Sequence, residues 1–257
     1  MFQRLIKNDL KENKVSMLVI GLFLLLTLTL SCAATRLTVS LTSSIERFVE
    51  TAKSPHLLQM HSGSVDQERL QNFVQQHPEI ASWQLTDFVN VEGSAIRINE
   101  KNSLQDSSQD NGFSSQNQNF DFLLDQNNRP AQPQPGQVYI PLYYYNSGKI
   151  KIGDQIRVGK LRLTVQGFIR DAQMNAGLVS SKRFLISPTD LQTLKKEAFT
   201  SNENLIAFRV HKLSQISAIE QAYKNAELES NGPPMITYPT IKMINGFNDA
   251  LVILVMG

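Results

Sequence analysis

The chain of 257 residues carries 25 lysines and arginines against 23 aspartates and glutamates, which leaves a net charge of +2. Because this charge is small and spread along the chain, it gives no electrostatic footprint for nucleic acid, and we expect no nucleic-acid partner. Cys32 is the only cysteine, so the polar part of the chain must hold its fold by burial alone, without a disulfide, as a domain of this size can.

Residues 1–14 are expected to form a short amphipathic helix in the cytoplasm. Apolar residues fall on one helical face, and charged residues cover the other. The apolar residues are Phe2, Leu5, Ile6 and Leu10. Such a helix lies on the inner leaflet of the membrane, with its basic side chains near anionic lipid. The alternative is a basic flank that only stops translocation.

The run from Val15 to Thr35 is apolar, uncharged and long enough to cross a bilayer as a helix. Four basic residues precede it, whereas only Arg36 follows it directly. The four are Arg4, Lys7, Lys11 and Lys14. Short flanks rich in lysine and arginine stay in the cytoplasm. We therefore expect a protein of the cell (plasma) membrane, with a cytoplasmic N-terminus and an extracellular main domain.

A cleaved signal sequence is the alternative interpretation of this run. The basic flank fits, but the apolar stretch is longer than a usual signal. A lipoprotein signal would place Cys32 at the cleavage site, yet Thr29-Leu30-Ser31 is a poor match before it. Neither alternative explains a second apolar run, Phe247 to Met256. Cys32 is therefore interpreted as a small residue in a membrane helix.

Helical spacing continues beyond the apolar run. Leu37, Leu41, Ile45 and Phe48 keep one apolar face, while polar residues fill the other positions. Ser54-Pro55 ends the pattern, since the residue before a proline disfavours helix. Residues 15–53 are thus predicted to be transmembrane helix 1 and a stiff stalk.

An α+β domain is predicted after the stalk, with a split βαβ subdomain at 54–98 and 203–239. Its first half has a strand at 56–61, a helix at 65–76 capped by Ser64, and a hairpin of 83–91 with 95–98 that turns at Glu92-Gly93. Its second half has a strand at 205–210, a helix at 214–226 and a strand at 235–238. Two strand–helix–strand halves of this kind pair into a ferredoxin-like sheet.

An insertion separates the two halves. Residues 99–119 are rich in Ser, Gln, Asn and Asp, and are expected to be a flexible polar loop. Residues 120–202 are expected to form a small β-rich subdomain. Its strands are predicted at 120–124, 137–145, 155–158, 161–170 and 177–186, with a tight turn at Gly159-Lys160 and a helix after Ser187-Pro188 that runs through Lys196.

No catalytic, cofactor-binding or metal-binding residue is predicted, so the chain is not expected to be an enzyme. His56 and His61 could share a strand, but no cysteine, and no acidic residue closer than Asp66, completes a metal set, so the histidines are expected at the surface or at an interface. They are His56, His61, His77 and His211. Asp154 after Gly153 fits a turn better than a catalytic loop, and Ser180-Ser181 has no identifiable base. Tyr143 to Tyr145 could stack a ligand, but a strand with half its aromatics in the core is favoured.

Several motifs in order resemble the extracytoplasmic domain of FtsX/MacB-like ABC transporter permeases, especially the long Gram-positive members. The motifs are Gln118 to Asp125, Gly136 to Pro141, Leu142 to Tyr145, Lys151 to Ile156, Gly167 to Asp171, Ala172 to Asn175 and Ser180 to Phe184. The chain has no phosphate loop, so by this resemblance the ATPase is a separate partner subunit. The other implied partners are the lipid bilayer and a second permease copy or homologue.

The resemblance implies a permease subunit that couples cytoplasmic ATP hydrolysis to export or to mechanical action outside the membrane. The split βαβ unit would be its porter-like subdomain. Residues 240–257 would begin transmembrane helix 2, so the chain looks like the N-terminal part of a permease, as a truncated gene product or a fragment. The alternative is a membrane-tethered extracellular binding or sensing domain without transport.

Overall fold

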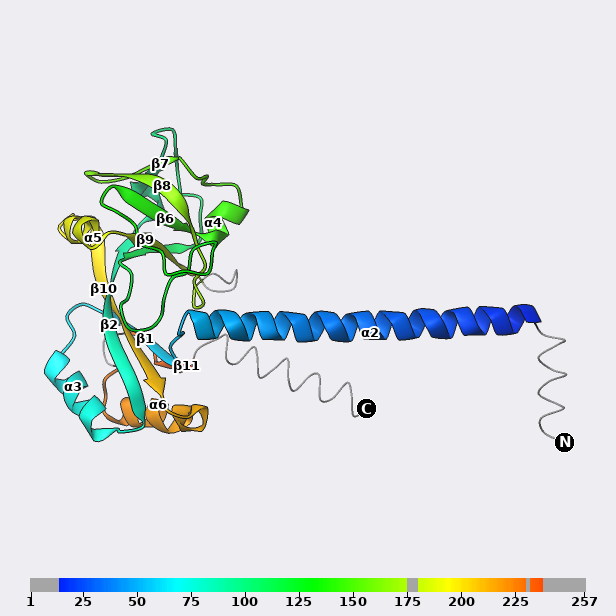
Figure 1. Ribbon diagram of the computed structural model, residues 1–257. Helices are drawn as coiled ribbons and strands as arrows, with labels where there is room; N and C mark the ends of the chain where they lie inside the picture. Colours follow the sequence, from blue (N-terminus) through cyan, green and yellow to red (C-terminus); the bar gives the residue numbers. More distant parts are fainter. Residues whose placement is uncertain (1–13, 175–179, 230–231, 238–257) are drawn as a thin grey trace. The chain divides into compact units, whose positions relative to one another are not determined.

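The computed structural model describes residues 14–174, 180–229 and 232–237 (Figure 1). The chain forms two compact units, Met1–Glu46 and Arg47–Gly257. The expected cytoplasmic helix up to residue 13 lies outside the described residues. So do the expected start of transmembrane helix 2 at 240–257 and the first residues of the strand expected at 177–186.

Helix α2, Lys14–Thr51, is one unbroken element of 38 residues. At 1.5 Å per residue it is roughly 57 Å long, nearly twice the roughly 30 Å hydrocarbon core of a bilayer. It is the one helix among the described residues that is long and apolar enough to cross a membrane. Hydroxyl groups inside it donate to carbonyls one turn earlier, as Thr27 Oγ1 does to Phe23 O at 2.8 Å. One helix therefore runs through both the expected membrane span and the expected stalk.

The split subdomain is built from two halves that lie far apart in the sequence. They are β1 (Leu57–Ser62), α3 (Gln67–Gln76) and β2 (Ile80–Val91), then β10 (Thr200–Val210), the 3-10 turn η2 (Leu213–Gln215), α6 (Ile216–Asn225) and β11 (Ile236–Thr237). The strands pair in the order β11-β1-β10-β2, each antiparallel to its neighbour. This order is the ferredoxin-like arrangement that the sequence predicts.

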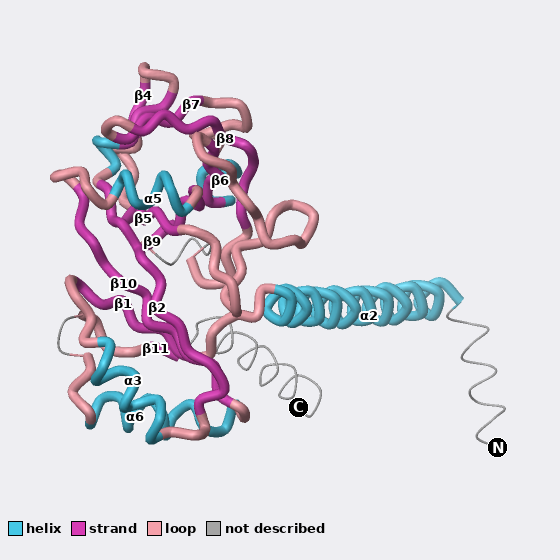
Figure 2. Tube along the Cα trace, turned by 60° about the vertical axis from the view of Figure 1, so that its left-hand side comes forward, coloured by secondary structure: helices cyan, strands magenta, loops and turns pink. Residues whose placement is uncertain are grey.

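Both faces of this sheet are covered. Alternate residues of a strand point to opposite faces. Leu57 and Phe208 pack with Tyr223 on the face that carries α3 and α6, which Figure 2 shows together beside the strands. Leu58 packs on the other face against Phe120, which comes from the insertion. The insertion is therefore part of the core of the split subdomain.

Between β2 and β10 lies the inserted subdomain, residues 96–194. Its elements are β3 (Ile96–Ile98), β4 (Asn102–Ser103), β5 (Asp110–Ser114), β6 (Gln137–Pro141), α4 (Leu142–Asn146), β7 (Gln155–Val158), β8 (Leu161–Ile169), β9 (Ser181–Ile186) and α5 (Pro188–Leu194). Its strands extend the same sheet from β2 in the order β5-β9-β6-β8-β7-β3-β4. The predicted hairpin of β7 and β8 is confirmed, and so is Ser187 as the N-cap of α5.

The prediction of a polar loop throughout 99–119 is wrong, because β4 and β5 lie inside it. Strand β5 pairs antiparallel with β2 and parallel with β9. Phe113 is fully buried, and its ring stacks on Phe184 with centroids 4.8 Å apart. A segment with a single large apolar side chain is held here by partners far away in the sequence.

The predicted hairpin of 83–91 with 95–98 is also wrong. After Glu92 the chain makes the 3-10 turn η1 (Gly93–Ala95), and β3 then pairs with β4 and β7 instead of β2. A Cβ atom on Gly93 would lie 2.3 Å from Leu104 O, so this turn requires glycine. Strand β3 thus belongs to the inserted subdomain and not to the range 54–98 of the split subdomain.

Three smaller predictions also differ from the structure. The N-cap of α3 is Asp66 and not Ser64; its side chain accepts a hydrogen bond from Arg69 N at 3.0 Å. The expected strand 120–124 contributes only isolated bridges at Leu124. The three tyrosines follow Pro141 on the short helix α4, where Tyr144 is buried and Tyr145 stacks on Phe168.

Candidate functional site

The side chains weighed as catalytic candidates do not converge on one site. The described residues contain no group of three or more His, Cys, Asp or Glu side chains that could hold a metal ion. His61 Nε2 lies 3.2 Å from Ser64 O, whereas the His77 ring packs on Phe73. Asp154 Oδ2 accepts a hydrogen bond from Lys151 N at 2.8 Å, so the predicted turn at Gly153-Asp154 is confirmed.

The segment that follows α2, Ala52–His56, is called the junction segment; Ala52, Ser54 and Pro55 are buried, whereas Lys53 is exposed. Together with the residues that it bonds to, it forms what we call the hub. Its carbonyl groups and its histidine ring bond to two different parts of the domain. Toward the inserted subdomain, Phe122 N donates to Ala52 O at 2.7 Å and Asp121 N donates to Lys53 O at 2.9 Å. Toward β10, His56 N donates to Phe208 O at 2.8 Å. The end of α2 is therefore fixed to both subdomains.

Further contacts hold the same place. Val210 N donates to His56 Nδ1 at 3.0 Å, and the Arg209 guanidinium donates to Ser54 O. In the last turns of α2, the Phe48 ring faces the Arg170 guanidinium at 5.4 Å. Ala52 and Ser54 are almost completely buried, so these residues of the junction segment pack as core residues and not as a linker.

Two residues of the hub have strained backbones. Lys53 has a φ of 45° and Asp121 a φ of 57°, both in the left-handed region that side chains other than glycine rarely adopt. These two residues are joined by the hydrogen bond from Asp121 N to Lys53 O. Backbone strain of this kind persists only where the surroundings fix it, and it gathers at functional sites.

Asp121 also belongs to a buried ion cluster with Asp171 and Arg183, which we call the Arg183 cluster. Arg183 on β9 is 1% exposed. Its Nε donates to Asp171 Oδ2 at 2.6 Å and its Nη1 to Asp121 Oδ2 at 2.8 Å. Gln173 adds a hydrogen bond to each aspartate, from its backbone N to Asp171 Oδ1 at 2.7 Å and from its amide to Asp121.

Burial and the charges of the partners act in opposite directions on the pKa values of the Arg183 cluster. Burial raises the pKa of Asp121, although the attraction of Arg183 works against this shift. Burial also disfavours the charged guanidinium, but the two carboxylates outweigh this effect and hold the pKa of Arg183 well above its usual range. Arg183 therefore stays charged and ties two loops to β9.

Sequence reasoning missed the Arg183 cluster, although its members all lie in motifs quoted for the family resemblance. Two of the three are charged residues beside large apolar ones, in Phe120-Asp121-Phe122 and Lys182-Arg183-Phe184, whereas Asp171 lies between Arg170 and Ala172. Charged residues are almost never fully buried unless they are paired. That pattern was the available signal, but the identity of the partners depends on the fold.

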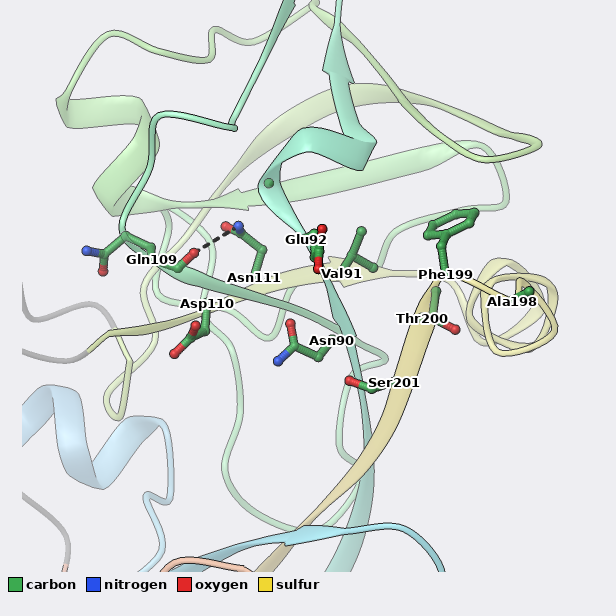
Figure 3. Close-up of a pocket in the computed structure, with 11 residues that line it drawn as sticks. Asn90, Val91, Glu92, Gln109, Asp110, Asn111, Ala198, Phe199, Thr200 and Ser201 are labelled. Carbon is green, nitrogen blue, oxygen red and sulfur yellow. Dashed lines mark hydrogen bonds between the residues drawn. The ribbon is translucent and has the colours of Figure 1, made fainter.

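An open polar cleft of about 520 Å³ lies where β2, β5 and β10 meet (Figure 3). Its lining residues are Asn90, Val91, Glu92, Gly93, Gln109, Asp110, Asn111, Ala198, Phe199, Thr200 and Ser201, with no lysine or arginine among them. Asn111 Nδ2 donates to Gln109 O at 3.1 Å at its floor. Beside the cleft, burial and then the charge of Asp110 raise the pKa of Glu203. The cleft can accept hydrogen bonds from a polar ligand, and among the described residues that line it we find no pairing of a nucleophile with a base.

Acidification is expected to loosen the junction segment through His56. Burial, and then the charge of Arg209, lower the pKa of this histidine to about 4. Between pH 6.5 and 4 the unfolded chain binds a proton that the folded chain does not, so the contribution of His56 to stability is complete above pH 6.5 and is lost as the pH falls toward 4. Because the ring is partly exposed, we expect a loss of roughly 1–2 kcal/mol.

The measurement is thermal unfolding of the full chain in detergent at pH 7 and pH 5, for wild type and His56→Asn. The asparagine oxygen can replace Nδ1 as the acceptor for Val210 N but does not titrate in this range. The wild type should lose more stability than the variant. Equal losses in the two proteins would contradict the assignment to His56.

Comparison with known proteins gives structural likeness only. No protein-family model and no curated protein matches the sequence. The extracellular domain of the noncanonic ABC-type transporter YknZ from Gram-positive bacteria is 12% identical, with a TM-score of 0.37 over 70% of this chain and 98% of that one. The periplasmic region of MacB from Actinobacillus actinomycetemcomitans is 10% identical, with a TM-score of 0.36 over 78% of this chain and 96% of that one.

A third solved structure, from Bacillus anthracis, carries the provisional description of a lipoprotein. It is 10% identical, with a TM-score of 0.36 over 70% of this chain and 96% of that one.

Proposed function

We propose that the chain is a permease subunit of an ABC transporter, in which α2 crosses the plasma membrane and carries movement into an extracellular domain. The observation that carries this proposal is the hub. The helix continues to Thr51, and the junction segment that follows is largely buried and is hydrogen-bonded to both subdomains. A tether that only holds a domain at the membrane needs neither a continuous helix nor a buried attachment.

In this proposal the energy comes from a separate ATPase subunit in the cytoplasm, and a second permease copy or homologue completes the membrane part. Displacement of α2 reaches the split subdomain through His56 and β10. It reaches the inserted subdomain through Asp121 and Phe122. In this proposal, ATP hydrolysis by the partner thus drives export or mechanical action outside the membrane. Support comes from the unbroken helix, the hub and the sequence motifs quoted above.

The alternative function, a tethered binding or sensing domain, is favoured by one observation, the polar cleft at β2, β5 and β10. A cleft of about 520 Å³ is within the size range of small-molecule sites. Such a domain would work without an ATPase. The permease function requires movement of α2 to reach the domain, whereas the tethered domain does not. An experiment that bends α2 therefore distinguishes the two functions.

Orientation in the membrane is tested with single cysteines in a Cys32→Ser background of the full chain in intact cells. The two variants are Ser62→Cys and Asn8→Cys. Ser62 lies at the exposed end of β1, and Asn8 lies before the apolar run. We expect a membrane-impermeant thiol reagent to label position 62 and not position 8, because the basic residues before the run keep that end in the cytoplasm. The reverse labelling pattern would overturn the proposed topology and with it the proposed function.

A further inference from the structure

We propose that Arg183 is a positioning residue that couples the end of α2 to the centre of the inserted subdomain, acting through Asp121. This inference rests on the proposed function, because it assigns the route by which movement of the helix reaches the inserted subdomain. The route has three steps: a pair of backbone hydrogen bonds, an ion pair, and the pairing of β9 with its neighbouring strands.

The first step joins the junction segment to the loop that contains Asp121. The backbone N–H groups of Asp121 and Phe122 donate to Lys53 O at 2.9 Å and to Ala52 O at 2.7 Å. Two adjacent hydrogen bonds fix the direction of the loop as well as its distance. Lys53 and Asp121 are both held in the left-handed backbone region, so this contact is kept against local preference.

The second step joins the loop to β9. The same Asp121 that donates its backbone N–H to Lys53 accepts two hydrogen bonds from Arg183 on its carboxylate, at 2.8 Å from Nη1 and 3.3 Å from Nη2. A guanidinium fork that bonds a carboxylate twice fixes its orientation, which a single apolar contact cannot do. The position of the loop is therefore set by the position of Arg183.

The third step places Arg183 inside the sheet. Strand β9 pairs with β5 on one side and with β6 on the other, so a displacement of Arg183 reaches both halves of the inserted subdomain. Asp171, the second carboxylate, directly follows Arg170, whose guanidinium faces the Phe48 ring of α2. Both aspartates of the Arg183 cluster are thus within one residue of a contact to the end of the helix.

Stability alone is a poor reason for this arrangement. Replacing a buried ion cluster as a whole by well-packed hydrophobic side chains of similar volume is often neutral or stabilising, whereas removing one member is strongly destabilising. A buried cluster between two moving parts instead supplies orientation. Replacing all three members together should therefore remove the coupling while the domain stays folded.

The test uses the full chain in membranes and the variant Asp121→Asn/Asp171→Asn/Arg183→Met, which removes all three charges together. The readout is hydrogen exchange at the backbone amides of Asp121 and Phe122. We expect exchange there to increase at least about tenfold, because the loop is no longer oriented, while the amides in the β1–β10 ladder keep their wild-type rates. In the assembled transporter, the activity outside the membrane should fall at least about tenfold while the ATPase of the partner continues.

The matched control is Asp87→Asn/Lys195→Met, which removes another ion pair, 2.7 Å long and partly exposed, between β2 and the residue after α5. It should leave exchange at Asp121 and Phe122 unchanged. If the triple variant fails to fold, Arg183→Lys decides, since it keeps the charge but loses the fork, and exchange at the two amides should again increase. Unchanged exchange at these amides in a folded variant overturns the proposal.

Faster hydrogen exchange at Asp121 and Phe122, with unchanged transporter activity outside the membrane, would also overturn the proposal. The Arg183 cluster would then orient the loop without coupling it to the movement of α2. The proposed function fails in a different way. In that case the wild-type chain shows no ATP-dependent activity outside the membrane, whatever the exchange rates of the variants.

Discussion

The Gly112→Ala variant is expected to lose more than about 3 kcal/mol of stability through the side chain of Phe88. A Cβ atom at position 112 would lie 1.9 Å from the Phe88 ring. That ring is fully buried in the core that contains Leu58 and Phe120, so it has no space to move. Asn90 faces Gly112 in the β2–β5 pairing, and this pairing is where the inserted subdomain joins the split one.

The measurement is thermal unfolding of the full chain in detergent, with a decrease in Tm on the order of 10 °C expected for a domain of this size. The control is the same substitution in a Phe88→Ala background, where the ring is absent and the added methyl group has space. There the further cost of Gly112→Ala should be close to zero, so the two changes should be strongly non-additive. Equal costs in the two backgrounds would show that the close approach of Phe88 is not the cause.

The split subdomain could be predicted from sequence because its signals are local. Each strand and helix has its own periodicity, and two strand–helix–strand halves of matching size have few ways to pair. Ser187 before Pro188 likewise marked the start of α5 correctly, since an N-cap and a proline in the first turn are local features. The ferredoxin-like pairing of the two halves was expected from these elements alone, and the structure gives the order β11-β1-β10-β2.

Strand β5 could not be predicted in this way. Its sequence, Asp110-Asn-Gly-Phe-Ser114, has one large apolar residue and glycine at its centre, which is typical of a loop. It becomes a strand because β2 and β9 offer it two partners, and because only glycine leaves room for the Phe88 ring. Both reasons belong to tertiary structure.

The hub escaped prediction for a related reason. Pro55 indicated correctly that the helix does not continue. Nothing local shows that Ala52 and Lys53 bond to Phe122 and Asp121, which lie far along the sequence. A buried charge can be suspected from its apolar neighbours. Its partners are known only once β8, β9 and the loop at 121 are placed in one structure.

The Ser43→Pro variant is expected to abolish the activity outside the membrane while leaving basal ATP hydrolysis by the partner intact. Ser43 lies inside α2, between the expected membrane span and the hub. Proline there removes a backbone hydrogen bond and clashes with the preceding turn, which kinks the helix at a cost of about 3 kcal/mol or more. Membrane insertion should survive, because the apolar run ends at Thr35, and the domain should keep its fold.

The matched control is Ser43→Ala, which removes the hydrogen bond from Ser43 Oγ to Val39 O at 2.7 Å but keeps the helix straight, since alanine has the highest helix propensity. Transport or resistance is measured in cells, beside the ATPase rate in membranes, for wild type and both variants. A subunit that transmits movement requires a rigid helix between the membrane and the hub, whereas a tethered binding domain works equally well on a bent one. Full outside activity in a correctly inserted Ser43→Pro variant would therefore exclude transmission through α2 and leave the tethered domain as the better function for this fold.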